Sequence, residues 1–202
     1  MNLVDELSEP PPPGSVLAGL PVFALPNVVF FPSMMLPLHV FEPRYRDMVA
    51  HAIRGDRRLA VALLRPGWEP DYYGAPSVHS VFTLGEIVRH EELPDGRSNV
   101  LLRGLARVRV LEEERTGLGF RTMRVQVAVT EADAAEAELL ARHLATVRQL
   151  FSARGGAVQR MASQDTELLF SSDLAAEIVL DAIAAANPAP SARKQEVLEE
   201  PN

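Results

Sequence analysis

The chain has 202 residues, of which 47% are apolar and 23% charged, a composition typical of a globular protein with room for a sizeable core. It contains no cysteine, which excludes disulfides, thiolate metal sites and thiol nucleophiles and favours the cytosol over an oxidising compartment. The net charge of −7 at pH 7 argues against a protein whose main role is to bind nucleic acid.

The first 19 residues predict a flexible, proline-rich leader. The start MNLVDELSEPPPPG is acidic and lacks the basic start and continuous apolar core of a signal peptide, and its consecutive prolines favour extended polyproline geometry. The sequence holds no run of about 18 apolar residues, which a membrane-spanning helix needs. We therefore expect a chain that is neither exported nor inserted in a membrane and that works in the cytoplasm.

Short apolar segments from Leu20 onward predict strands. These segments are LPVFAL, MLPLHVF and RLAVALLR. Between the second and the third, a helix is expected to begin at Glu42, because Pro43 is tolerated at the first helical position and apolar residues then recur at helical spacing. Gly55 is expected to end this helix.

Two long extended segments predict a β-hairpin. SVFTLGEIVRHEEL and RSNVLLRGLARVRVLEE flank Pro94-Asp95-Gly96, a turn signal with a known mechanism. The segment FRTMRVQVAV alternates apolar and polar residues and should extend the same antiparallel sheet. Gly117-Leu118-Gly119 lacks the third glycine and the following helix of a dinucleotide-binding motif, and we interpret it as a hairpin turn.

After Thr130 the pattern changes to helix. The first expected helix carries on one face Leu140, Leu144, Val147 and Phe151. A second helix is expected through Leu174 and Ile183, with Ser172 or Asp173 as its cap, and a short third one over 193–199. Strands followed by helices predict an α+β fold, divided into a leader (1–19), a strand-rich part (20–130) and a C-terminal helical part (131–202).

The sequence contains no catalytic motif that we recognise. It lacks the Gly-Lys-Ser/Thr loop that binds nucleotide phosphates and the Gly-x-Ser-x-Gly turn of serine hydrolases. The single lysine, Lys194, lies near an acidic tail, which is a poor environment for lowering a lysine pKa. The five histidines do not show the spacing of a helical metal site. We therefore assign no catalytic residue, no metal ligand and no cofactor.

Four arginines define a possible basic face. On a regular strand Arg103, Arg107 and Arg109 lie on one side, and Arg121 of the next segment joins them. Such a face would suit RNA, but no aromatic residue for base stacking accompanies these arginines. A solvated or internally salt-bridged face is the favoured interpretation, and nucleic acid is not the expected partner.

Together, these segments resemble a known family. LPNVVFFP, PLHVFEPRYR and the DGR turn followed by RGLARV are similar to the N-terminal, substrate-binding domain of the Lon ATP-dependent proteases. The chain looks closest to stand-alone bacterial members that consist of this domain. The resemblance covers Leu20 to the C-terminus and implies a PUA-like antiparallel β-barrel with a short helix, followed by helices. It implies no enzyme, because the ATPase module and the Ser-Lys protease module have no counterpart here.

The resemblance leads to the hypothesis of a module that binds unfolded polypeptide or a partner protein, in protein quality control or as an adaptor. Two loops supply the candidate contacts, which are Phe31, Met34, Met35, Trp68, Tyr72 and Tyr73. Methionine suits irregular ligands and loop aromatics are common interface anchors, although core packing would explain the methionines as well. An RNA-binding PUA-like domain and a small-molecule-binding barrel stay open as alternatives.

Overall fold

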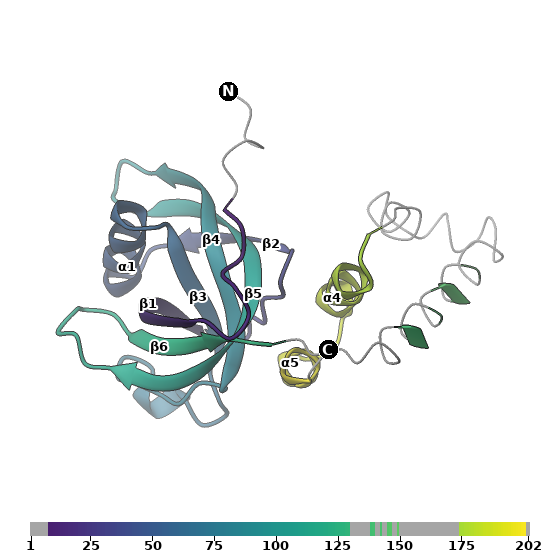
Figure 1. The fold of residues 1–202 in the computed structure, drawn as a ribbon. Helices are drawn as coiled ribbons and strands as arrows, with labels where there is room; N and C mark the ends of the chain where they lie inside the picture. Colours follow the sequence, from purple (N-terminus) through teal and green to yellow (C-terminus); the bar gives the residue numbers. More distant parts are fainter. Residues whose placement is uncertain are drawn as a thin grey trace. The chain divides into compact units, whose positions relative to one another are not determined.

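The structure is a computed structural model that describes residues 8–129 and 174–200, together with the single positions 138, 139, 142, 145, 146 and 149. It divides into two compact units. The first unit contains the described residues 8–129 and 188–200, and the second contains 174–187 and the single positions between 138 and 149. Figure 1 shows residues 8–129 of the first unit as a curved sheet with one α-helix, residues 43–54, beside it.

Six strands form one sheet in the order β2-β5-β4-β3-β1-β6, and β6 pairs with β5 as well. The strands are β1 (Val16–Leu25), β2 (Met35–Val40), β3 (Arg58–Leu63), β4 (Val81–Glu92), β5 (Ser98–Glu114) and β6 (Thr122–Val127). Because β6 returns to β5, the strands β5, β4, β3, β1 and β6 close into a ring, and β2 extends the sheet beside β5 (Figure 1). The expected barrel with a short helix is confirmed.

The sheet is mixed, which corrects the expectation of a purely antiparallel barrel. Strands β1 and β3 pair in parallel, with Val22 opposite Ala60, while the other named pairs are antiparallel. A parallel pair requires a long crossover connection, and here the crossover contains β2 and the helix α1. The hydrophobic pattern of each strand gave no sign of this pairing, because it depends on contacts far apart in the sequence.

Helix α1 (Pro43–Arg54) has the predicted ends. Glu42 is its N-cap residue, proline occupies its first position, and Gly55 is its C-cap. The side chains that it buries toward the sheet are Tyr45, Met48, Val49 and Ala52. They join one core cluster with residues of β1, β2, β3, β4 and β5. A second cluster draws on all five ring strands and fills the opposite face of the sheet, inside the ring.

The long hairpin of β4 and β5 is also confirmed, with Gly96 in the left-handed region at φ 79° in its turn. Strand β5 has 17 residues, and its first part pairs with β2 while its last part pairs with β6. Near its middle, the Cα partners shift, so that Gly104 and Ala106 lie opposite the adjacent residues Gly85 and Leu84. Leu105 is therefore the extra residue of a β-bulge.

The connection between β1 and β2 passes close to β5. Phe30 and Phe31 are buried there, and the Ser33 N–H donates to the Gly104 carbonyl at 3.0 Å. A Cβ at position 104 would overlap the backbone carbonyl of Phe31. Gly104 is thus the residue that lets this connection lie directly against the sheet.

Strand β1 begins at Val16, four residues before the expected start at Leu20. Residues 8–15 of the expected leader are described and contact the barrel: the Gly14 N–H donates to the Val127 carbonyl at 3.0 Å, and Pro11 is buried. These residues are part of the first unit.

Two helices follow the barrel in the described residues. Helix α4 (Ala176–Ala186) belongs to the second unit and begins after Ala175, its N-cap residue, downstream of the expected caps Ser172 and Asp173. Helix α5 (Ser191–Glu199) belongs to the first unit, where the Gln195 side chain donates to the Val81 carbonyl at 2.8 Å. The expected apolar face of 140–151 lies outside the described residues. None of the described helices is both long and apolar enough to span a membrane.

Candidate functional site

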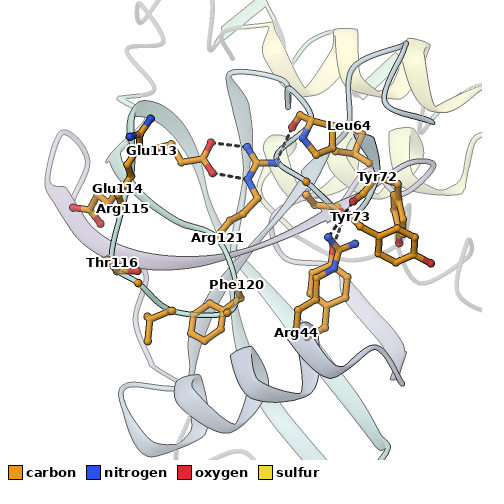
Figure 2. A pocket seen from close by; sticks show the side chains of 17 residues that line it. Arg44, Leu64, Tyr72, Tyr73, Glu113, Glu114, Arg115, Thr116, Phe120 and Arg121 are labelled. Carbon is orange, nitrogen blue, oxygen red and sulfur yellow. Dashed lines mark hydrogen bonds and ion pairs between the residues drawn. The ribbon is translucent and has the colours of Figure 1, made fainter. Parts of the chain in front are cut away.

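A pocket of about 280 Å³ lies between two connections of the barrel (Figure 2). One wall is the segment between β3 and β4, which includes the short 3-10 helix η1 (Glu69–Asp71). The other wall is the tip of the β5–β6 hairpin, residues 113–121, and the first turn of α1 closes the pocket. The volume is near the lower limit of small-molecule pockets and suits one side chain of a polypeptide.

Arg44 is the central cation of the pocket. Its guanidinium lies 4.6 Å from the ring centroid of Tyr45, 4.8 Å from that of Tyr72 and 5.7 Å from that of Tyr73. Its Nη1 donates to the Tyr72 carbonyl at 3.0 Å, and its Nε donates to Glu42 Oε2 at 3.1 Å. Cation–π contacts of this kind hold aromatic rings in fixed positions. Arg44 therefore links the start of α1 to the β3–β4 connection.

Glu42 completes this link from the same turn of α1. The Tyr72 hydroxyl donates to Glu42 Oε1 at 2.7 Å. Burial raises the pKa of Tyr72, and the hydrogen bond to Glu42 raises it further because that bond requires the protonated hydroxyl. The phenol of Tyr72 thus remains a neutral donor well above neutral pH.

Tyr45 forms the floor of the pocket. Its hydroxyl donates to the Ala24 carbonyl at 2.9 Å, and its ring centroid lies 4.0 Å from that of Phe23. Burial raises the pKa of Tyr45 to about 12, although the adjacent Arg44 opposes the shift. The floor is therefore uncharged and fixed to β1.

Arg121 holds the hairpin wall in place. Its Nε and Nη2 each lie 2.7 Å from an oxygen of Glu113, and its Nη1 donates to the Pro76 carbonyl at 2.8 Å. Such a two-pronged pair fixes the guanidinium geometry, so Arg121 joins the two walls, as Figure 2 shows. Leu118 is exposed at the hairpin tip, and Phe120 is half-buried in the pocket lining.

The three candidate aromatics of the second loop come together. The centroid of Tyr72 lies 5.4 Å from that of Trp68 and 5.1 Å from that of Tyr73, both in edge-to-face geometry. Tyr72 and Tyr73 line the pocket, and Tyr73 is 85% exposed. A large, exposed aromatic held at a pocket rim is the kind of residue that anchors an interface.

The candidate residues of the first loop do not line that pocket, and they differ in exposure. Phe31 is fully buried, and its contact with the sheet explains its position. Met34 is half-buried against the core cluster that α1 covers, whereas Met35 is 53% exposed on β2. Of these three residues, Met35 is the one whose side chain can reach a partner without rearrangement.

The four arginines do not form the expected common face. On β4, the partners of Arg103 and Arg107 are Glu86 and Thr83, and residues three apart on a strand point to opposite sides. The bulge at Leu105 causes this change of side. Arg103 is paired with Glu86 at 3.0 Å, the Arg107 Nε donates to the Leu198 carbonyl of α5 at 3.3 Å, and Arg109 is exposed.

Sequence reasoning missed Arg44, Tyr45, Phe120 and Arg121 as pocket residues, although Arg121 was noted for its charge. The nearest sequence signal was Glu42-Pro43-Arg44, which places a charged pair at the start of the expected helix. In the part of the chain that the structure describes, no three His, Asp or Glu side chains group as a metal site would need. The pocket thus offers aromatic surface and paired charges for binding.

Comparisons with known proteins identify the family and the fold. The family model described as the ATP-dependent protease La (LON) substrate-binding domain matches residues 19–202. Over 126 residues, the chain is 32% identical to the Lon protease of Xanthomonas oryzae, which covers 62% of this chain and 15% of that protein. It is 29% identical to the Lon protease of Paraburkholderia phytofirmans over 206 residues, covering 96% of this chain and 25% of that protein. The chain thus spans a quarter or less of these relatives.

Solved structures share the fold. The N-terminal domain of a Mycobacterium avium complex Lon protease superposes with a TM-score of 0.66 at 16% identity, covering 91% of both chains. A Lon N-terminal domain protein from Xanthomonas campestris gives 0.55 at 22% identity, covering 92% of both chains. At these identities the likeness concerns the fold.

Proposed function

The chain belongs to the family of the Lon substrate-binding domain, and from this premise we propose that it is a non-catalytic module that binds polypeptides at the pocket between Arg44, Tyr73 and the β5–β6 hairpin. The name of the family supports polypeptide binding in general. A role in protein quality control or as an adaptor, with a partner protease or another protein, is part of the same proposal.

One observation carries the proposal: Tyr73 is 85% exposed at the rim of a pocket in which Arg44 holds the rings of Tyr45 and Tyr72. An exposed, large aromatic next to preformed rings offers apolar area at little cost in conformational entropy. On the opposite wall, Leu118 is exposed as well. A polypeptide could insert an apolar or aromatic side chain between these walls.

The charges in the pocket support the binding of polypeptides of varied sequence. Arg44 is paired with Glu42 and Arg121 with Glu113, so both guanidiniums already have carboxylate partners. A ligand therefore gains from apolar contact more than from a new ion pair. This arrangement fits segments of varied sequence that expose apolar side chains, as unfolded chains do.

The test uses the full chain and a tryptophan-free unfolded protein, reduced and carboxymethylated ribonuclease A. Trp68 is the only tryptophan and contacts the pocket residue Tyr72, so its fluorescence reports on the pocket through that contact. We expect a saturable change in the Trp68 signal with a Kd on the order of tens of micromolar, and a loss of at least about fivefold in affinity in Tyr73→Ala.

Phe41→Ala provides the matched control, because Phe41 is also a large exposed aromatic, at 60%, but does not line the pocket. Its affinity should equal that of the unchanged chain. Equal losses in both variants would show non-specific adhesion, and no binding to the unchanged chain would refute the proposal.

The alternatives gain no comparable support. The arginines that motivated RNA binding face different sides of the sheet, and Arg103, Arg107 and Arg121 already contact protein groups. For a small molecule in the barrel, the ring interior is occupied by its own apolar cluster. We therefore favour polypeptide binding.

A further inference from the structure

A second group of polar residues, away from the pocket, surrounds a segment of the chain itself. Arg58 on β3, Glu86 on β4 and Arg103 on β5 are direct neighbours across the three strands. Their positions share the face of Ala60 and Leu84, which belong to the cluster inside the ring. We call these three residues the polar row. It lies next to the apolar cluster along the strands, and its charges alternate from one strand to the next.

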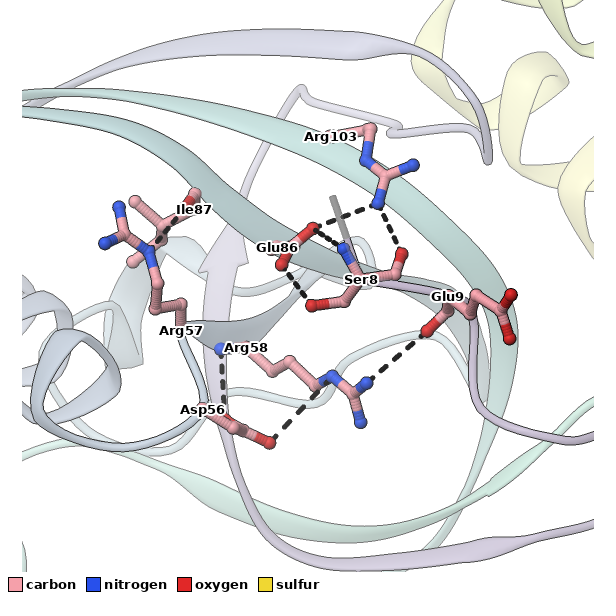
Figure 3. Close-up of polar contacts among 8 residues, drawn as sticks. All are labelled: Ser8, Glu9, Asp56, Arg57, Arg58, Glu86, Ile87 and Arg103. Atoms are coloured by element: carbon pink, nitrogen blue, oxygen red, sulfur yellow. Dashed lines mark hydrogen bonds and ion pairs between the residues drawn. The ribbon is translucent and has the colours of Figure 1, made fainter. Parts of the chain in front are cut away.

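This row contacts the backbone of residues 8 and 9 (Figure 3). The Ser8 hydroxyl donates to Glu86 Oε1 at 2.5 Å, and the Ser8 N–H donates to Glu86 Oε2 at 3.4 Å. Arg103 Nη2 donates to the Ser8 carbonyl at 2.6 Å, and Arg58 Nη2 donates to the Glu9 carbonyl at 3.5 Å. Each polar backbone group of Ser8 thus has a side-chain partner on the sheet, and its hydroxyl is bound as well.

The contacts resemble those by which a protein binds a peptide. Three side chains from three strands bind an N–H, a hydroxyl and two carbonyls of one extended segment, and charge-assisted hydrogen bonds of this kind are strong and directional. Glu86, whose carboxylate accepts both hydrogen bonds from Ser8, is only 4% exposed. Arg103 forms an ion pair with this carboxylate at 3.0 Å. The row is preorganised by the sheet and by this ion pair.

Two hydrogen-bond donors of the row are not used by the leader. Arg103 Nε is buried and has no hydrogen-bond acceptor among the described residues, and Arg58 Nε is also without a hydrogen bond there, although Asp56 Oδ2 lies 3.9 Å from it as an ion-pair partner. Buried donors without an acceptor are uncommon in proteins. The leader therefore does not use every donor that the two guanidiniums present, and another segment with a further carbonyl or hydroxyl could do so.

The leader is bound by few contacts besides these. Among residues 8–13, Pro11 alone is buried. Residues 14 and 15 are fastened to β6 through the Gly14 N–H and the Val127 carbonyl, at 3.0 Å. Residues 8–13 thus form a segment that is anchored at one end and held at the other by polar contacts with the row.

From these observations we propose that Arg58, Glu86 and Arg103 form a second polypeptide-binding site, specific for a segment that carries a serine or threonine, and that the leader occupies it in cis through Ser8 and Glu9. The leader is then a tethered competitor. Its local concentration at the row is in the millimolar range for a short tether, so a segment from another protein binds well only when the leader is released. This site goes beyond the polypeptide binding proposed for the pocket.

The test compares two full-length proteins, the unchanged chain and Ser8→Pro. Proline at position 8 removes both donors that Glu86 accepts, which weakens the leader in its own site. A fluorescein-labelled peptide LVDELSEPPPPG, which copies residues 3–14, is titrated by anisotropy with each protein up to about 1 mM, the range set by the tether. We expect binding to Ser8→Pro to be at least about tenfold tighter than to the unchanged chain, because the competitor is weakened.

Two controls test whether the serine hydroxyl of the peptide and the guanidinium of Arg58 make the binding contacts. A peptide with alanine in place of its serine should bind Ser8→Pro at least about tenfold more weakly, since it lacks the hydroxyl for Glu86. Arg58→Gln in the Ser8→Pro protein should also weaken binding. Arg57→Gln should not, because the Arg57 side chain donates to the Ile87 carbonyl instead. Thermal melts of all four proteins show whether each is folded.

Equal affinity of the peptide for both proteins, or equal affinity of the serine and alanine peptides, would overturn the proposal. So would the absence of binding to a folded Ser8→Pro protein. Tyr73→Ala should leave peptide binding at the row unchanged, so that failure here and failure of the pocket as a binding site are distinguished by separate measurements.

Discussion

Arg44 contacts Tyr72 in two independent ways: its Nη1 donates to the Tyr72 carbonyl at 3.0 Å, and its guanidinium lies 4.8 Å from the centroid of the Tyr72 ring. The first contact fixes the backbone of the β3–β4 connection and the second fixes the side chain. The position of an exposed aromatic at the pocket rim, Tyr73, therefore depends on a residue in the first turn of α1.

Arg44→Lys should loosen this connection while keeping the charge. Lysine lacks the planar fork that can hydrogen-bond and stack together. We expect the free energy of unfolding to fall by about 1–2 kcal/mol, measured by urea denaturation, and Trp68 fluorescence to shift in the folded protein. Arg46→Lys, two residues further in the same helix and exposed, should change neither quantity. Equal stability of Arg44→Lys and the unchanged chain would contradict this role.

Gly104→Ala should destabilise the first unit. The added Cβ would overlap the Phe31 carbonyl, and overpacking against backbone costs about 2 kcal/mol. The comparison is Gly119→Ala, where the nearest atom to an added Cβ is 4.0 Å away. Urea denaturation of both proteins should show a lower midpoint for Gly104→Ala alone, and a stable Gly104→Ala would mean that the Phe31 connection can move.

The stability contributed by Glu86 should depend on acid pH. Burial raises the pKa of Glu86, but hydrogen bonds from Ser8 and Arg103 lower it more, so that the net pKa lies below its usual value of 4.5. The charged groups that face it are Arg103 on β5 and Arg58 on β3, the latter with Asp56 beside it. A lowered pKa contributes stability that is complete above pH 4.5 and is lost as the pH falls through the native pKa.

Glu86→Gln should therefore cost about 3 kcal/mol of unfolding free energy at pH 7, because it leaves Arg103 without its buried partner. The difference between the variant and the unchanged chain should shrink at pH 3. Urea denaturation at pH 7 and at pH 3 measures this difference in stability. The control is Glu112→Gln, because the ion pair between Glu112 and Arg124 is exposed. A difference that is constant with pH would exclude the ion pair as its cause.

Tyr45 should ionise later than an ordinary tyrosine when the pH is raised. Its pKa is raised to about 12 by burial, whereas an unfolded tyrosine titrates near 10. A raised pKa contributes stability that is complete below pH 10 and is lost as the pH rises toward 12. In a Tyr72→Phe background, which removes the other tyrosine whose pKa is raised, absorbance at the phenolate band should show a late phase that Tyr45→Phe removes. Persistence of this phase in the double variant would assign it elsewhere.

The elements that depend on local signals were predictable. Helix α1 has the expected ends because Pro43 and Gly55 act on their own neighbours. The hairpin of β4 and β5 follows from its Pro-Asp-Gly turn in the same way. The features that were missed depend on distant partners: β1 begins at Val16 because β6 lies beside it, with Gln126 opposite.

The same distinction explains the candidate site. The grouping of Trp68, Tyr72 and Tyr73 was expected, since they lie close together in one long loop, whereas Arg44 reaches Tyr72 only through the fold. The prediction of a common arginine face was wrong for a related reason. It assumed that side chains alternate regularly along the strand, and the bulge at Leu105 interrupts this alternation between Arg103 and Arg107. One extra residue in a strand leaves no clear trace in the sequence.

Closure of the ring has a consequence for how the chain acquires its structure. Strand β1 pairs with β6, placing Val16 opposite Gln126, so the two ends of the barrel segment must meet before the ring is complete. Contacts between residues so far apart slow folding. At synthesis rates of about 5–20 residues per second, one edge of β1 stays unpaired for several seconds until β6 has been synthesised. During that interval a newly made barrel exposes an unpaired strand edge, and the chain then needs the same protection from aggregation as other nascent proteins.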